Sequence, residues 1–217
     1  MPTQPYRVKA GAGSLHNLRT GQLTELPKAL QSAFFGPEFS RYGVHDDGSC
    51  FFHTVCSALN LGNCRNKSAE ARQRIGHQFR RSIQKQLSEE NWHNIWKRRQ
   101  VRDPQLLPKA AKVRQMLGST STWADVYMIF VTMDLLDLNL VFFDATSDQI
   151  YCGVRGLDTQ NQRTVLVLWI NHSHFEPIVR HGKDFVYDKN DPFVQQLMRK
   201  YHTEACTGDA DNIMHVL

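Results

Sequence analysis

One cysteine stands where a helix is expected to begin. Cys50 lies in HDDGSCFFHTVCSAL (45–59), directly after Asp47, Gly48 and Ser49, which suit a tight turn. In a first helical turn, unpaired N–H groups and the positive end of the helix dipole converge. This setting lowers the pKa of a thiol, and the same N–H groups can hold a developing oxyanion. The segment therefore predicts a nucleophile with its charge-stabilising donors; the alternative is a buried, unreactive cysteine.

A thiolate nucleophile needs a base, and the best candidate lies in WINHSHFEPIV (169–179). Side chains alternate between the faces of a strand, so His174 and Glu176 should point to the same side. The carboxylate could then accept the ring N–H and orient the imidazole. His172 lies on the same face and is the rival base, whereas Asn171 would lie on the opposite face. An ordinary surface pair on an edge strand is the alternative for His174 and Glu176.

Helices are expected to position the cysteine. Residues 36–49 contain three glycines and a proline, so they are read as a loop that precedes a helix. Apolar residues that recur every three to four positions, with capping residues, predict the other helices. The expected helices are 28–35, 50–60, 68–87, one that Ser88 caps, one from Pro104 to Gly118, and one from Thr122 to Leu136.

Strands are expected to position the histidine. After Asn139 the chain contains short runs rich in β-branched and aromatic residues. The expected strands are 139–143, 149–153, 165–170, 174–179 and 185–188, followed by a helix that Asp191 and Pro192 open and that runs to about His202. Helices first and strands later predict an α+β fold in which helices cover a sheet.

The composition of the 217 residues suits one domain with a real core, since 41% of them are hydrophobic. The N-terminal sequence lacks the apolar region of a secretory signal, and the longest apolar runs are too short to span a bilayer. The chain has five cysteines. An odd, scattered set without an export signal predicts reduced thiols, in the cytosol or nucleus.

Three blocks of the sequence resemble the ovarian-tumour (OTU) family of cysteine proteases. DGSCFF (47–52) matches the D-G-x-C-x-F signature, and HFEP (174–177) is similar to the family's histidine segment. Between them, TWADVYMIFVTMDLLDLNLVFF (122–143) resembles the middle block. The resemblance implies a papain-like OTU fold, with a central, mostly antiparallel sheet sandwiched by helices. The implied organisation is an N-terminal arm with a short helix (1–37), a catalytic domain (38–202) and a flexible C-terminal tail (203–217).

The resemblance also implies hydrolysis of isopeptide bonds at the C-terminus of ubiquitin. Carried over by position, Cys50 is the nucleophile and His174 the base. Glu176 stands where the family usually has Asp or Asn, and its side chain is one methylene longer. The orienting role therefore falls either to Glu176 or to Asp47. Trp123 is expected to support the fold rather than to touch substrate.

Asp47 would otherwise shape an oxyanion loop, whose donors would be the backbone N–H groups of Gly48, Ser49 and Cys50. No metal or organic cofactor is expected. The implied partners are ubiquitin, polyubiquitin chains and ubiquitin-like modifiers, and a monomer without a membrane span is expected. The implied location is the cytoplasm, which would be the host cytosol for a viral protein or a bacterial effector.

Three other hypotheses were weighed. A zinc site is disfavoured, because the chain has no C-x-x-C pair and Cys56, Cys64 and His53 do not have a recognised zinc spacing. A nucleic-acid-binding protein is the second reading, because 65–102 contains eleven Lys or Arg against three Glu, with Trp92 and Trp96 interleaved. Such binding would depend on exposed cations, among them Arg80, Arg81, Lys97 and Arg98. The third reading is a catalytically impaired relative that binds ubiquitin.

Overall fold

The structure is a computed structural model, and it describes residues 15–98, 107–145, 150–152 and 163–201. The elements in chain order are β1 (Leu23–Glu25), α1 (Lys28–Ala33), β2 (Phe39–Tyr42), α2 (Cys50–Leu59), the 3₁₀ helix η1 (Leu61–Asn66), α3 (Ala69–Gln86), α4 (Glu89–Arg98), α5 (Ala110–Gly118), α6 (Val126–Leu136), β3 (Leu138–Asp144), β4 (Ile150–Cys152), β5 (Arg163–Ile170), β6 (His174–Arg180), β7 (Tyr187–Asp188) and α7 (Pro192–Tyr201).

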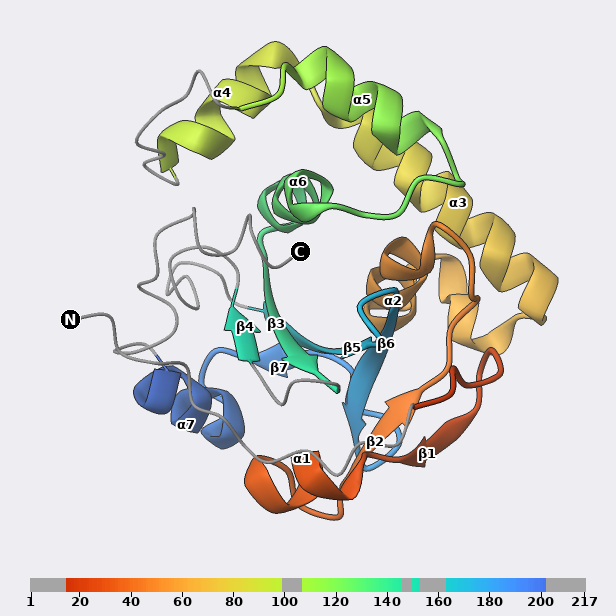
Figure 1. The fold of residues 1–217 in the computed structure, drawn as a ribbon, viewed down its shortest axis with the longest axis vertical. Helices are drawn as coiled ribbons and strands as arrows, with labels where there is room; N and C mark the ends of the chain where they lie inside the picture. Colours follow the sequence, from red (N-terminus) through yellow and green to blue (C-terminus); the bar gives the residue numbers. More distant parts are fainter. Residues whose placement is uncertain (1–14, 99–106, 146–149, 153–162, 202–217) are drawn as a thin grey trace.

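A single mixed sheet forms the centre of the molecule. Its strand order is β1-β2-β6-β5-β3-β4, and β7 pairs with β5 beside this path. The β3–β5 pairing is parallel, and the other pairings among the described residues are antiparallel. Figure 1 shows α1 and α7 on one side of the sheet and the arc of α2 to α6 on the other. The predicted α+β fold, with a mostly antiparallel sheet between helices, is confirmed.

The two helical layers enclose two apolar clusters, one on each face of the sheet. Along β5, Val167 belongs to the cluster under α2 to α6, whereas Leu166 and Leu168 belong to the cluster under α1 and α7. Because both faces of β3 and β5 are buried, these strands have unbroken apolar sequences rather than alternating ones. The sheet is therefore a rigid support for residues at its ends.

Local sequence signals placed several helices correctly. The helix that opens at Cys50 is α2, as predicted. Ser68 caps α3 by accepting a hydrogen bond from the N–H of Ala71, and Ser88 accepts one from the N–H of Asn91 at the start of α4. These hydroxyl groups satisfy N–H groups that lack a partner in the first turn of a helix.

Other boundaries were wrong. The predicted loop 36–49 contains β2, which pairs with β6 across more than half of the chain. Because its partner strand is so distant in the chain, the four residues of β2 alone do not predict this pairing. Helix α6 begins after Asp125 rather than Thr122, because the Asp125 carboxylate accepts the N–H of Met128. Helix α5 begins at Ala110, while Pro104, the expected start, and the tail 203–217 lie outside the described residues.

No helix in the described ranges is both long enough and apolar enough to cross a membrane.

Candidate active site

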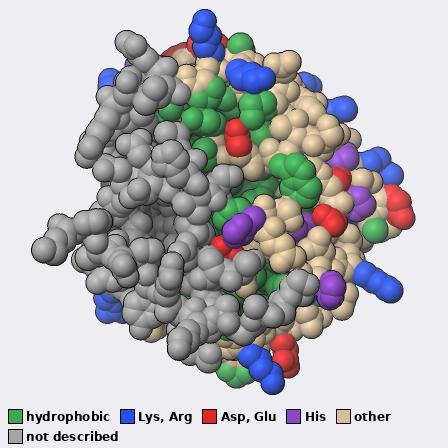
Figure 2. Space-filling model, viewed as in Figure 1, with side chains coloured by type: hydrophobic (Ala, Val, Ile, Leu, Met, Phe, Trp, Pro, Cys, Tyr) green, Lys and Arg blue, Asp and Glu red, His purple; other side chains and the backbone are tan. Residues whose placement is uncertain are grey.

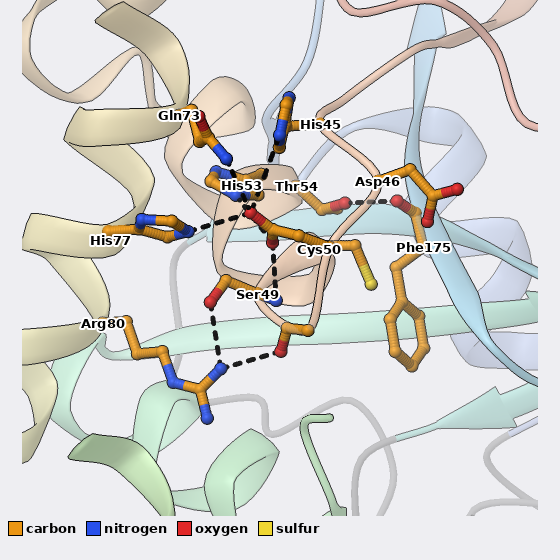
Figure 3. A network of polar contacts seen from close by, with 12 residues as sticks. His45, Asp46, Ser49, Cys50, His53, Thr54, Gln73, His77, Arg80 and Phe175 are labelled. Atoms are coloured by element: carbon orange, nitrogen blue, oxygen red, sulfur yellow. Dashed lines mark hydrogen bonds and ion pairs between the residues drawn. The ribbon is translucent and has the colours of Figure 1, made fainter. Parts of the chain in front are cut away.

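Helix α2 and strand β6 bring the predicted nucleophile and base to the same end of the sheet. The hydroxyl of Thr54 donates a 2.8 Å hydrogen bond to the carbonyl of Phe175, which joins the two elements (Figure 3). The rings of Phe51 and Phe175 pack beside this bond, with centroids 5.9 Å apart. Cys50 lies at the N-terminus of α2, and its Sγ is 3.8 Å from the carbonyl oxygen of Ser173, the residue before His174.

The Cys50 thiol is buried, with 1% of the residue exposed, and burial was the alternative that the sequence left open. Burial, with smaller contributions from the carboxylates of Asp46 and Asp47, raises the pKa of this thiol to about 12. The predicted lowering of the pKa is therefore wrong for this structure. Loss of water around the sulfur outweighs the favourable field of the helix N-terminus. Cys50 is a neutral thiol in this state.

His174 lies between two carboxylates. Its Nε2 is 3.6 Å from Oε1 of Glu176, so the two side chains do share a face of β6, and its Nδ1 is 3.3 Å from Oδ1 of Asp46. The ring is fully buried, and neither nitrogen has a hydrogen bond within the described part of the chain. Asp46 was missed by the sequence analysis; the only signal for it was its position beside Asp47. Both contacts of His174 are therefore at ion-pair distance without hydrogen-bond geometry.

Glu176 has other partners besides the histidine. Its Oε1 accepts a 2.8 Å hydrogen bond from the backbone N–H of Leu18, and its Oε2 lies 3.4 Å from Nη1 of Arg41. The Glu176 side chain thus has one hydrogen bond, from Leu18, and the guanidinium of Arg41 lies at ion-pair distance as its counter-charge.

The segment 15–18 runs along both carboxylates that flank His174. The side-chain amide of Asn17 donates a 2.8 Å hydrogen bond to Asp46, and the N–H of Leu18 donates to Glu176. This segment belongs to the predicted N-terminal arm, for which no part in the site was expected.

The rival base His172 has a carboxylate of its own. Its Nε2 is 3.0 Å from Oδ2 of Asp144, and its ring stacks on Trp169 with centroids 4.7 Å apart. His172 lies in the turn between β5 and β6 and is 55% exposed. Asn171 lies in the same turn, and its amide donates to the carbonyl of Leu15. Because His172 already forms an imidazole–carboxylate pair, it stays a candidate base.

The expected oxyanion loop is folded onto Asp47. The N–H of Ser49 donates to the Asp47 carboxylate (2.7 Å), and the N–H of Cys50 donates to the Asp47 carbonyl (3.0 Å). Among the described residues, the N–H of Gly48 has no such acceptor. A Cβ at Gly48 would lie 2.5 Å from the carbonyl oxygen of Thr120, so only glycine fits there. Two of the three expected N–H donors, those of Ser49 and Cys50, thus already form hydrogen bonds, and the N–H of Gly48 is the one that does not within the described ranges.

Arg80 holds this loop in place through hydrogen bonds. Its guanidinium donates to the carbonyl of Gly48 (2.7 Å), to the hydroxyl of Ser49 (3.0 Å) and to the carbonyls of Leu117 and Thr122. Burial lowers the pKa of Arg80 to about 10, which leaves the group charged at neutral pH. The prediction that Arg80 is an exposed cation is wrong: the side chain is completely buried and positions the loop before Cys50.

Asp47 serves a different group of residues from the one expected. Its carboxylate accepts hydrogen bonds from the rings of His53 (3.1 Å) and His77 (2.9 Å), and no ion pair joins it to His174 in the described ranges. In this structure Glu176 and Asp46, rather than Asp47, face the ring of His174. The hydrogen bonds hold the pKa of Asp47 well below its ordinary value, although burial alone would raise it.

Trp123 is 46% exposed, and the expectation that it supports the fold rather than touches substrate stays a prediction. It follows the segment Thr120–Thr122, which contacts Gly48 and Arg80. An exposed aromatic ring therefore stands close in sequence to the loop that carries the candidate nucleophile.

On the face drawn in Figure 2, histidine and acidic side chains gather near one another, while Lys and Arg side chains lie mainly around the outline.

The fold is similar to that of a solved OTU domain in complex with ubiquitin. The two share 19% identity over 82% of this chain and 88% of that chain, with a TM-score of 0.52. Weaker likenesses include the OTU protease of Qalyub virus (18% identity, 65% and 84% covered, TM-score 0.44) and an OTU deubiquitinase from Wolbachia pipientis wMel (14%, 74% and 96%, 0.41). No family model and no curated protein matches the sequence. The first likeness shows that the chain has the OTU fold predicted from its sequence.

Proposed function

We propose that the protein is a cysteine-dependent deubiquitinase that cleaves isopeptide bonds at the C-terminus of ubiquitin. The observation that carries the proposal is the placement of Cys50 at the N-terminus of α2, against the turn that ends at His174. The OTU fold and the DGSC sequence support the same substrate class, and the similar solved structure contains ubiquitin.

The proposed reaction uses Cys50 and His174. His174 takes the proton of the thiol, and the sulfur attacks the carbonyl carbon at the ubiquitin C-terminus. The carbon–nitrogen bond then breaks as protonated His174 gives its proton to the departing lysine amine. Water attacks the thioester and passes a proton to His174, which returns it to the sulfur as the carbon–sulfur bond breaks.

Glu176 and Asp46 are the proposed orienting groups. Each carboxylate lies within 3.6 Å of a different nitrogen of the His174 ring, so either acid could stabilise the imidazolium that forms during catalysis. Glu176 faces Nε2 and Asp46 faces Nδ1. We assign the orienting role to Glu176 because it is the more deeply buried and is anchored by Arg41.

The state described here is a resting state in this proposal. The thiol is protonated and buried, and the N–H groups of Ser49 and Cys50 are engaged by Asp47. Binding of the ubiquitin tail would have to open a path to the sulfur and turn the loop, so that N–H groups face the developing oxyanion.

The test is reaction with ubiquitin that carries an electrophile at its C-terminus. We expect one covalent adduct, mapped to Cys50 by mass spectrometry, and none with Cys50→Ala. His174→Ala should abolish or strongly slow the adduct, whereas His172→Ala should retain it. His93→Ala changes an exposed histidine on α4 and is the matched control.

The same experiment distinguishes the proposed enzyme from an impaired relative, and His174 from His172 as the base. Tight but non-covalent binding of the probe would support an impaired, ubiquitin-binding relative. Failure of the wild type to bind or react would contradict the proposal. Loss of the adduct in His172→Ala, with retention in His174→Ala, would assign the base to the His172–Asp144 pair instead.

A further inference from the structure

Three histidines from separate segments converge on Asp47. The Nε2 atoms of His53 and His77 lie 3.1 and 2.9 Å from different oxygens of its carboxylate, and Nε2 of His45 lies 3.8 Å from one of them. Figure 3 shows the three rings and Gln73 pointing at this one carboxylate. The rings of His53 and His77 are close to each other, with centroids 5.3 Å apart.

The spacing of these atoms suits a metal ion. One donor atom from each of Asp47, His53 and His77 lies within 4.8 Å of the other two. Bonds of about 2.0 Å to a tetrahedral Zn²⁺ place its ligand atoms about 3.3 Å apart. The three contacts between Asp47 and the histidines, from 2.9 to 3.8 Å, bracket this separation. Imidazole and carboxylate groups are ligands that zinc accepts.

This cluster of side chains lies where α2 packs against α3. His53 is almost completely buried on α2, and α3 approaches it at Gly76, where a Cβ would lie 1.9 Å from Nδ1 of His53. Glycine at this position lets the two helices come close enough for His77 to reach Asp47. Gln73, one turn earlier on α3, faces the same carboxylate.

We propose that Asp47, His53 and His77 bind a divalent ion of the zinc class, with His45 close to the same carboxylate. The site is separate from Cys50 and His174 and needs no cysteine. The cysteine-based spacings considered in the sequence could not predict it, because its ligands come from a loop and two helices. His45, Asp47 and His77 are partly exposed, which gives an ion a path to the site.

An ion at this site would also act on the loop before Cys50. The same Asp47 oxygen that faces His53 accepts the N–H of Ser49. Metal binding would therefore tie α2, α3 and this loop together, in addition to the clamp from Arg80. The expected result is a more stable fold when the ion is bound.

The test uses Cys50→Ala protein, so that a thiolate at the candidate active site cannot supply a ligand. After removal of metal with a chelator, equilibrium dialysis against Zn²⁺ should show one bound ion per chain. Co²⁺ in its place should give the visible absorption of a four-coordinate site with nitrogen and oxygen ligands. Zn²⁺ should also raise the melting temperature.

The variant that tests the ligands is His77→Ala in the same background. His77 is partly exposed, so its removal should leave the fold intact, and binding should weaken by more than about tenfold. His93→Ala, at an exposed position on α4, should bind as the parent does. Three outcomes would overturn the proposal: no retained Zn²⁺, unchanged affinity in His77→Ala, or binding by the wild type that disappears in Cys50→Ala.

Discussion

At the scale of single residues, burial decides the state of the candidate nucleophile. The helix N-terminus favours a thiolate, but the sulfur of Cys50 is removed from water and faces two carboxylates. With its pKa raised to about 12, the thiol of Cys50 is protonated in the resting protein at neutral pH. Activation would then depend on substrate binding rather than on a permanently charged cysteine.

This state predicts the pH dependence of alkylation. With the pKa raised to about 12, the thiolate fraction of Cys50 grows with pH throughout the neutral and mildly alkaline range. Labelling of Cys50 by iodoacetamide should therefore rise by about tenfold per pH unit between about pH 7 and pH 10. Peptide mass spectrometry can follow this residue alone. A rate that is already constant above about pH 7 would show that the resting thiol is ionised.

Arg80 holds the loop before Cys50 in place, so its replacement should disturb the candidate site. Arg80→Lys keeps the charge but loses the planar fork that reaches Gly48, Leu117 and Thr122. The unfolding free energy should fall by about 2 kcal/mol or more, because buried carbonyl groups lose their donors. Chemical denaturation measures this. Arg81→Lys, at the exposed neighbouring position, is the control and should change stability little.

At the scale of elements, α7 closes one face of the sheet and is held by Asp191. This carboxylate accepts the N–H groups of Phe193 and Val194 at the start of α7 and forms two hydrogen bonds with Arg180 on β6. Burial alone would raise the pKa of Asp191, but the hydrogen bonds from Arg180 and Phe193 lower it below its ordinary value.

Asp191→Ala should therefore lower the unfolding free energy by about 1 to 2 kcal/mol at neutral pH. Since the pKa is depressed in the folded state, this stabilisation is present above the unfolded pKa of about 3.9 and is lost as the pH falls below it. The difference between wild type and variant should shrink from about pH 6 to pH 3. A difference that stays constant over this range would mean that the charge of Asp191 contributes nothing.

Element type was largely predictable, while long-range pairing was not. Helices α2 and α3 follow from local periodicity and capping, and β5 follows from a run of buried apolar residues. The strand β2 and the convergence of segment 15–18 on Glu176 depend on partners distant in the chain. The same holds for Asp46 and Arg80: their roles come from the fold that surrounds them rather than from neighbouring residues.

At the scale of the whole molecule, we propose that the exposed ring of Trp123 contacts substrate. Its segment packs against the loop that precedes Cys50, so Trp123→Ala should lower kcat/KM for ubiquitin substrates while leaving the melting temperature unchanged. The matched control is Leu23→Ala, since Leu23 is the other large apolar side chain exposed among the described residues. A fall in melting temperature, with unchanged kcat/KM, would assign Trp123 to the fold.

The basic stretch 65–102 remains a separate prediction for the molecule's surface. Arg81, Lys85 and Lys97 are exposed, so they can still meet an anionic partner, whereas Arg80 cannot. Charge-neutralising variants at the three exposed positions, with Cys50→Ala, would test nucleic-acid binding without disturbing the loop. Binding that is salt-dependent and lost in these variants would favour the second reading.

The central claim is that Cys50 and His174 act as a nucleophile and its base. The most direct measurement is the rate at which the protein hydrolyses a fluorogenic amide at the C-terminus of ubiquitin. We predict turnover by the wild type, a loss of several orders of magnitude in both Cys50→Ala and His174→Ala, and near-normal turnover in His172→Ala. Full activity in His174→Ala, or in Cys50→Ala, would contradict the account.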